Sequence, residues 1–243
     1  MKIIVIPDVH LKPWLFDRAD DILTSGKAER AVCLMDIPDD WNMEFQVEHY
    51  KKTFDRAISF AENRPDTLWC YGNHDISYIW GKLEAGYSVY AEKIVIAKLE
   101  ELKNCLRDTE QLAFIHRVDN VLFMHGGLTE EFLQRFDKEL LNADIDDVVS
   151  AVNAASPDQL WNDESPLWFR PQYSKQKIFR NDRFKQVVGH TPVDVIFEKE
   201  GVISTDVFST YWNGRQIGES AMIVVDSETG EYEKVAVAEA KTI

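Results

Sequence analysis

Cysteine is scarce in this chain. The three cysteines, Cys33, Cys70 and Cys105, are widely spaced and odd in number, and none of them forms a C-x-x-C pair. This spacing supports neither a disulfide framework nor a zinc knuckle. We therefore expect buried free thiols in a reducing cytosol.

Long apolar runs are missing as well. No stretch approaches the roughly 18 apolar residues that a transmembrane helix needs. The N-terminal run "MKIIVI" is stopped by Pro7 and Asp8, far short of the apolar core of a signal peptide. We therefore expect a soluble, cytoplasmic protein without membrane contact.

Basic residues are outnumbered by acidic ones. The chain has 27 Lys and Arg against 42 Asp and Glu, a formal net charge of -15. This balance argues against strong binding to nucleic acid, which depends on neutralising phosphates, and it suits cations instead. With 243 residues, 45% of them hydrophobic, and no break in composition, the chain is predicted to form a single domain over 1–243.

Short apolar runs alternate with amphipathic segments in the first third of the chain. Strands are predicted at 3–6, 31–35 and 68–71, and helices at 14–24 and 45–61. This order of strand and helix predicts parallel strands joined by crossover helices, so the fold class is α/β.

The remaining chain predicts more helices and then a return to strands. Helices are expected at 89–103, 130–136 and 145–155, a hairpin turns at Asp119-Asn120, and an ordered loop region covers 156–185. The last strands are expected at 184–190, 194–199, 201–205, 221–226 and 232–239.

Side chains that can bind metals follow five of these strands. They are Asp8 and His10, then Asp36 and Asp39, then Asn73, His74 and Asp75, and finally His125 and His190. The carboxyl ends of parallel strands meet at one sheet edge, so we expect them to lie together. Carboxylates, neutral imidazoles and an amide oxygen suit Mn²⁺, Fe or Zn²⁺. These candidates are more than one tetrahedral ion needs. Their number predicts two ions ~3.5 to 4 Å apart that share a carboxylate and hold a hydroxide.

With these residues the chain resembles the calcineurin-like metallophosphoesterase superfamily. The ordered signature D-x-H, G-D-x-x-D, G-N-H-[DE], H and G-H appears here as Asp8-Val9-His10, Met35-Asp36-Ile37-Pro38-Asp39, Gly72-Asn73-His74-Asp75, His125 and Gly189-His190. "HGGL" and "GHTP" are most similar to the phosphoprotein phosphatase branch, which includes bacterial and phage serine/threonine phosphatases and diadenosine tetraphosphatases. One such motif is weak evidence, but five in order are strong.

The resemblance implies a fold and a role for each residue. The fold is a four-layer α/β/β/α sandwich of two mixed sheets flanked by helices. Asp8, His10 and Asp36 would bind the first ion, and Asp36 would bridge to a second ion held by Asn73, His125 and His190. His74 would protonate the leaving oxygen as general acid, and Asp39 would orient His74 and raise its pKa.

The chain departs from the family pattern after Asp39. The phosphoprotein phosphatase branch has G-D-x-x-D-R-G, whereas Met35, Asp40 and Trp41 replace the first glycine, the arginine and the last glycine here. Arg170 in "SPLWFRP" is the candidate for the missing phosphate clamp, with a surface salt bridge as its other reading. Alternatively, Asp40 repels dianionic monoesters and favours a diester or a substrate with a basic flank.

The function predicted from the sequence is a phosphomonoesterase of the phosphoprotein phosphatase type. Its nucleophile would be the hydroxide between two divalent ions, for which Mn²⁺ is the first expectation, and its substrate a phosphoprotein or a nucleotide. The alternatives are a nucleotide pyrophosphatase or phosphodiesterase, like the diadenosine tetraphosphatases, and a metal-binding scaffold without activity. Asp206 gets no role, Asp75 is expected to make a structural hydrogen bond, and Trp41 and Trp168 fall beside the site segments.

Overall fold

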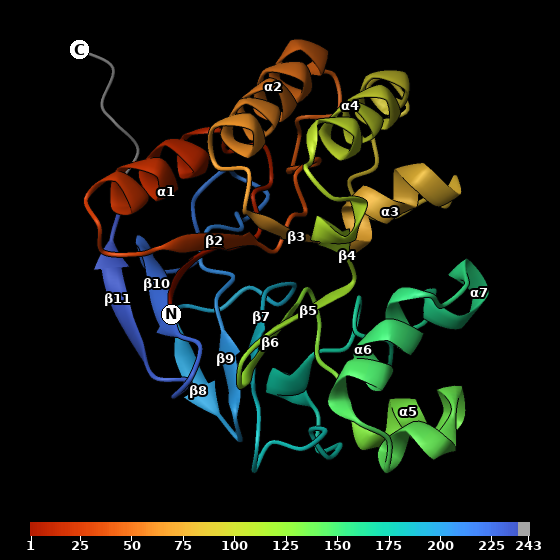
Figure 1. Ribbon diagram of the computed structural model, residues 1–243. Helices are drawn as coiled ribbons and strands as arrows, with labels where there is room; N and C mark the ends of the chain where they lie inside the picture. Colours follow the sequence, from red (N-terminus) through yellow and green to blue (C-terminus); the bar gives the residue numbers. More distant parts are fainter. Residues whose placement is uncertain (238–243) are drawn as a thin grey trace.

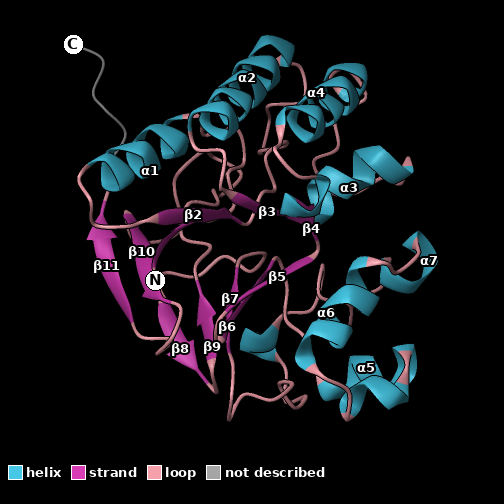
Figure 2. Ribbon diagram, in the orientation of Figure 1, coloured by secondary structure: helices cyan, strands magenta, loops and turns pink. Residues whose placement is uncertain are grey.

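The computed structural model describes residues 1–237 and places them in two packed β-sheets between two layers of helices (Figures 1 and 2). Each sheet contains both parallel and antiparallel pairs. The predicted α/β class and the four-layer sandwich of two mixed sheets are therefore confirmed.

The first sheet has six strands in the order β11-β10-β1-β2-β3-β4. The pairs within β1 to β4 are parallel, and β10 and β11 add antiparallel strands at the edge. The strands are β1 (Lys2–Ile6), β2 (Arg30–Cys33), β3 (Leu68–Cys70), β4 (Leu112–Ala113), β10 (Ala221–Asp226) and β11 (Tyr232–Ala236). Because β1, β2 and β3 run parallel, the loops that follow them leave the sheet at the same edge.

The second sheet has five strands in the order β5-β6-β7-β9-β8. The pairs β6-β7 and β7-β9 are parallel, and the outer pairs are antiparallel. The strands are β5 (Ile115–Val118), β6 (Val121–Met124), β7 (Lys185–Val188), β8 (Phe197–Lys199) and β9 (Val202–Ser204). Residues of both sheets, among them Ile4, Val32, Phe123 and Val187, share one buried core.

Three helices, α1 (Trp14–Thr24), α2 (Val47–Asn63) and α4 (Glu92–Cys105), cover the outer face of the first sheet (Figure 1). Helix α2 shows why. Tyr50, Phe54, Ala57 and Ala61 recur at intervals of three and four residues and are buried, so they form one apolar stripe. Most of the polar residues of the helix are exposed or half-buried, and Thr53 is a buried exception.

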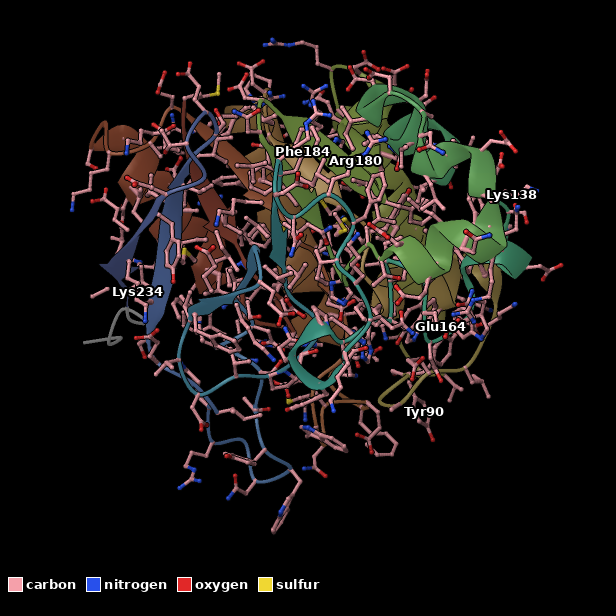
Figure 3. All side chains as sticks on the ribbon, turned by 90° about the horizontal axis from the view of Figure 1, so that it is seen from below. Tyr90, Lys138, Glu164, Arg180, Phe184 and Lys234 are labelled. Carbon is pink, nitrogen blue, oxygen red and sulfur yellow. The ribbon has the colours of Figure 1, made fainter. Side chains whose placement is uncertain are left out.

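Three helices, α5 (Glu130–Phe136), α6 (Ile145–Asn153) and α7 (Pro157–Leu160), lie beside the second sheet. The loop region predicted at 156–185 is ordered. It contains α7 and, among the described residues, one of three short 3₁₀ turns. Arg180, labelled in Figure 3, belongs to this region. Its Nη2 donates to the carbonyls of Leu141 and Ala143, at 3.0 and 2.6 Å, and connects the region to the helix layer. The 3₁₀ turns are η1 (Thr109–Gln111), η2 (Lys138–Leu141) and η3 (Pro171–Tyr173).

The structure departs from the sequence prediction at three elements. Helix α3 (Asn73–Trp80) was not predicted, and it begins on Asn73, just after the strand predicted at 68–71. The first strand of the predicted hairpin is divided at Phe114, because β4 pairs with β3 in one sheet and β5 pairs with β6 in the other. Strand β11 ends at Ala236, and 238–239 of the expected last strand lie outside the described residues.

Two further expectations concern the cysteines and the membrane. Cys33 and Cys70 are buried free thiols as predicted, whereas Cys105 is only half-buried because it ends α4 near the surface. Among residues 1–237, no helix has both the length and the apolar character needed to cross a bilayer.

Candidate metal centre and active-site cleft

The six predicted ligands converge where the two sheets meet. Carboxylate and imidazole atoms form two sets, Asp8 with His10 and Asp36, and Asp36 with His125 and His190, and the ligand atoms of each set lie within 4.8 Å of one another. Oδ1 of Asn73 joins the second set, 3.0 Å from Nε2 of His125 and 2.9 Å from Nδ1 of His190. Asp36 belongs to both sets. A carboxylate that bridges two ions would need to lie in this way beside both groups of ligands.

The hydrogen bonds of His125 indicate a place for a cation. Nδ1 donates to the carbonyl of Leu34 at 3.1 Å, while Nε2 faces Oδ1 of Asn73 and Oδ2 of Asp36, both at 3.0 Å. A neutral imidazole has one proton to donate, so Nε2 would oppose two acceptors with a lone pair. Without a metal, the carboxylates of Asp36 and Asp8 outweigh burial and raise the pKa of His125 to about 9. A divalent cation would satisfy all three atoms instead.

Two buried polar atoms of this cluster have no protein partner among the described residues. They are Oδ1 of Asp8 and Nε2 of His190. Leaving a buried polar atom unpaired costs about 1 to 3 kcal/mol, so native proteins rarely do it without reason. Because both atoms belong to predicted ligands, the donor set fits metal ions at this place.

The backbone around the cluster is strained. His10, Asp36, Asp39 and His190 all adopt positive φ, between 39° and 66°, although none of them is glycine. Such conformations cost energy and concentrate at functional sites.

Two glycines give the carboxylates room. A Cβ on Gly72 would lie 2.0 Å from Oδ1 of Asp36, and a Cβ on Gly189 would lie 1.8 Å from Oδ1 of Asp8. Both positions therefore require glycine for as long as these carboxylates occupy the cluster.

Carboxylates crowd the first set. Burial and the charges of Asp206 and Asp36 raise the pKa of Asp8 well above its ordinary value. Burial also raises the pKa of Asp36, but the neighbouring imidazoles outweigh it and lower the pKa overall. Asp206, which has no role in the sequence-based prediction, is fully buried and accepts a hydrogen bond from Oγ of Ser209 at 2.9 Å. Divalent cations would relieve this repulsion, since each adds positive charge beside the carboxylates.

His74 and Asp39 form a pair beside the cluster. Nδ1 of His74 donates to Oδ2 of Asp39 at 3.0 Å, and the other carboxylate oxygen accepts from the hydroxyls of Tyr50 (3.0 Å) and Tyr78 (2.6 Å). These bonds fix the carboxylate and, through it, the imidazole ring. Burial lowers the pKa of His74, but the charges of Asp36 and Asp39 outweigh it and raise the pKa to about 9. The two tyrosines come from α2 and α3, and no motif in the sequence indicates them.

Asp75 supports the site through the backbone. Its carboxylate accepts hydrogen bonds from the N–H groups of Asp36 (2.8 Å), Ile37 (3.1 Å) and Gly72 (3.0 Å). It therefore joins the loop after β2 to the start of α3, which is the structural hydrogen bonding expected from the sequence. His10 is held similarly, because its Nδ1 donates to the carbonyl of Asp39 at 2.9 Å and leaves Nε2 facing Asp36.

A cleft of about 240 Å³ opens onto this cluster. It is lined by His10, Asp36, Asp39, Asp40, Trp41, Asn73, His74, Glu84, Ala85, Gly86, Trp168, Arg170, His190, Pro192, Ser209 and Thr210. Nη1 of Arg170 donates to the carbonyl of His190 at 3.0 Å. Within residues 1–237, the guanidinium of Arg170 forms no ion pair. The alternative role of Arg170 in a surface salt bridge therefore has no support there.

Asp40 is not a free negative charge in this cleft. Its Oδ2 accepts from Nζ of Lys12 at 2.9 Å, and its Oδ1 accepts from the hydroxyl of Thr210. The lysine outweighs the effect of burial and lowers the pKa of Asp40. The sequence-based alternative, in which Asp40 repels dianionic monoesters, loses its basis because a cation lies against this carboxylate.

This pair should stabilise the mouth of the cleft. The side chains of Lys12 and Asp40 are 14% and 16% exposed, so Asp40→Asn leaves a largely buried ammonium without its counter-charge. We expect it to lower the free energy of unfolding by about 1 to 3 kcal/mol. Lys12→Met in the same chain should recover part of the loss, which urea unfolding of the single and double variants would measure. Additive losses would show that the two groups do not interact.

Comparisons with known proteins agree with this geometry. A profile of the calcineurin-like phosphoesterase family matches residues 1–220. No curated protein sequence gives a significant match.

Several solved structures have a similar fold. A cold-active protein-tyrosine phosphatase from a psychrophilic Shewanella species has 20% identity and a TM-score of 0.58, with 96% of this chain and 80% of that chain covered. A hypothetical protein from Pyrococcus horikoshii OT3 has 13% identity and a TM-score of 0.51, with 99% and 89% covered. At these identities the likeness concerns the fold.

Proposed function

The chain belongs to the calcineurin-like phosphoesterase family, and from this premise we propose that it is a phosphomonoesterase of the phosphoprotein phosphatase type. We further propose that it uses two divalent metal ions, with Mn²⁺ as the first candidate and Fe or Zn²⁺ as the others. Its substrate would be a phosphoprotein or a nucleotide.

One observation carries the proposal: two sets of ligand atoms share Asp36, directly beside a histidine that is paired with a buried carboxylate. In the proposed arrangement Asp8, His10 and Asp36 would hold one ion, and Asp36, Asn73, His125 and His190 would hold the other. Two such ions would supply an activated water and neutralise charge on the phosphoryl oxygens.

The protein's own groups supply the proton. His74 lines the cleft, and its Nδ1 is engaged by Asp39, so Nε2 is the atom that can donate to a leaving oxygen. Asp39 stabilises the charged imidazole and is itself fixed by Tyr50 and Tyr78. A scaffold that only binds metal would need the ligands but not this pair.

Arg170 is the proposed phosphate clamp. Its backbone lies in the segment before β7, its side chain lines the cleft, and one of its terminal nitrogens is bound to the carbonyl of His190. A planar guanidinium can bind two phosphate oxygens at once. Arg170 would then replace the arginine that is missing at position 40.

The test is hydrolysis of p-nitrophenyl phosphate beside bis(p-nitrophenyl) phosphate, by protein stripped with a chelator and titrated with Mn²⁺. We expect turnover that requires the metal and prefers the monoester. Preference for the diester would favour the phosphodiesterase or nucleotide pyrophosphatase alternative. No turnover of either substrate with the metal bound would favour the scaffold.

A further inference from the structure

Two tryptophans line the proposed active-site cleft. Trp41 comes from the loop between β2 and α2, and Trp168 from the segment before β7. Trp41 is 57% exposed. It lines the same cleft as His74, which places its ring where it can contact a bound substrate.

Trp168 is held in a fixed orientation. Its ring packs edge to face on Trp161, with 4.5 Å between the ring centroids and 70° between the planes. Its Nε1 donates to Oε2 of Glu84 at 3.2 Å, which joins it to the loop after α3. The ring is half-buried, so one part packs on the protein while it still lines the cleft. A surface that is fixed before binding costs little entropy to use.

The size of the cleft limits what can reach both rings. Its volume of about 240 Å³ is below the roughly 300 to 1,000 Å³ of pockets that enclose drug-sized ligands. A phosphate bonded directly to one aromatic ring is compact. A nucleotide places a ribose between its phosphate and its base, and therefore needs more room.

We infer that the cleft selects aryl phosphomonoesters, such as a phosphotyrosyl side chain, and that Trp41 and Trp168 contact the aromatic ring of the substrate. This inference rests on the proposed function and narrows its substrate class. Hydrolysis breaks the P–O bond to the ring. Water supplies the oxygen that phosphorus gains. His74 gives a proton to the departing phenolate and regains one from the attacking water, so no further reactant is needed.

The other exposed aromatic side chains of residues 1–237 do not line this cleft. Trp212 is 73% exposed, and Phe45 and Tyr90 stack on each other with centroids 4.7 Å apart. Figure 3 shows Tyr90 at the outer edge of the molecule. Trp212 is a matched control, because its backbone carbonyl accepts from Nδ2 of Asn42, beside Trp41, while its side chain is not among those that line the cleft.

The test compares variants rather than substrates, because an aryloxide leaves more easily than an alkoxide whatever the shape of the cleft. KM and kcat are measured with Mn²⁺ for phosphotyrosine, phosphoserine and adenosine 5′-monophosphate. Trp41→Ala and Trp168→Leu should each raise KM for phosphotyrosine about three- to tenfold, the range of one aromatic contact, and leave KM for phosphoserine within twofold. Trp168→Phe should restore most of the loss, and Trp212→Ala should change none of these values.

Three outcomes would overturn the inference. They are an equal rise of KM for phosphoserine, no rise for phosphotyrosine, or a rise confined to the nucleotide. Binding of phenylphosphonate and methylphosphonate, measured by calorimetry on the Mn²⁺-loaded protein, needs no turnover. If the protein hydrolyses nothing, the proposed function fails, but tighter binding of the phenyl compound that is lost in Trp41→Ala would still support the aromatic contact. Equal binding of the two compounds would refute it.

Discussion

Asp36→Asn should abolish binding of both metal ions and lower kcat/KM by about 10³-fold or more, since the metal contributes several kcal/mol to stabilising the transition state. Asp36 is the one residue that both sets of ligand atoms contain. The substitution keeps the shape of the side chain, and its oxygen can still accept from the N–H of His74, as Oδ1 of Asp36 does now at 2.9 Å. The loss would therefore reflect the missing charge.

Metal content by mass spectrometry and thermal unfolding with and without Mn²⁺ would check this result. Ligands that bind the native state raise its melting temperature, so Mn²⁺ should stabilise the unmodified protein and not the variant. Asp55→Asn is a suitable control, because Asp55 lies on α2 and binds Lys51 and Lys98 at 2.8 and 2.6 Å. An Asp36→Asn protein that keeps two bound ions would contradict the bridging role.

The convergence of the candidate ligands could be predicted from sequence because it follows from strand direction. A short apolar run followed by Asp, Asn or His places the polar residue at the carboxyl end of a strand, and parallel strands bring those ends together. Asp8, Asp36 and Asn73 illustrate this, since they follow β1, β2 and β3 of one parallel set.

The groups that hold these residues could not be predicted, because they depend on how distant segments pack. Tyr50 and Tyr78 look like ordinary apolar positions of two helices, and only the fold brings both hydroxyls to Asp39. Lys12 and Asp40 are 28 positions apart and form an ion pair only because the loops after β1 and β2 are adjacent. The sequence motif therefore showed that an aspartate replaces the arginine at position 40. It did not show that Lys12 neutralises the charge of this aspartate.

The division of the hairpin was missed for a related reason. The apolar run from Leu112 to Ile115 continues from β4 into β5, so the sequence predicts one strand. Asn153 on α6 accepts from the N–H groups of both Phe114 and Ile115, at 3.0 and 2.9 Å, and thereby satisfies the backbone where the chain changes sheets. A contact from a residue so distant in sequence leaves no local signal.

His74→Asn should separate proton donation from metal binding. None of the proposed ligand roles falls on His74, so the variant should bind two ions with unchanged stoichiometry. Its kcat should fall by about 10²- to 10⁴-fold for an alkyl phosphate, whose leaving oxygen needs a proton, and by much less for p-nitrophenyl phosphate, whose leaving group departs as a stable anion. Loss of a metal ion in this variant would show that His74 is a ligand.

Asp39→Asn provides the companion measurement, since it keeps the hydrogen-bond acceptor for Nδ1 of His74 and removes the charge. The carboxylates of Asp36 and Asp39 both raise the pKa of His74, but bound cations would offset the charge of Asp36, which leaves Asp39 as the group that keeps the imidazole protonated. Because the proton donor is the charged form, activity is lost as pH rises through the pKa of His74. Asp39→Asn lowers that pKa, so the alkaline limb of the profile of kcat against pH should move to lower pH for the alkyl phosphate. An alkaline limb that stays in place in Asp39→Asn would mean that another group sets it, and His74 would no longer be the acid.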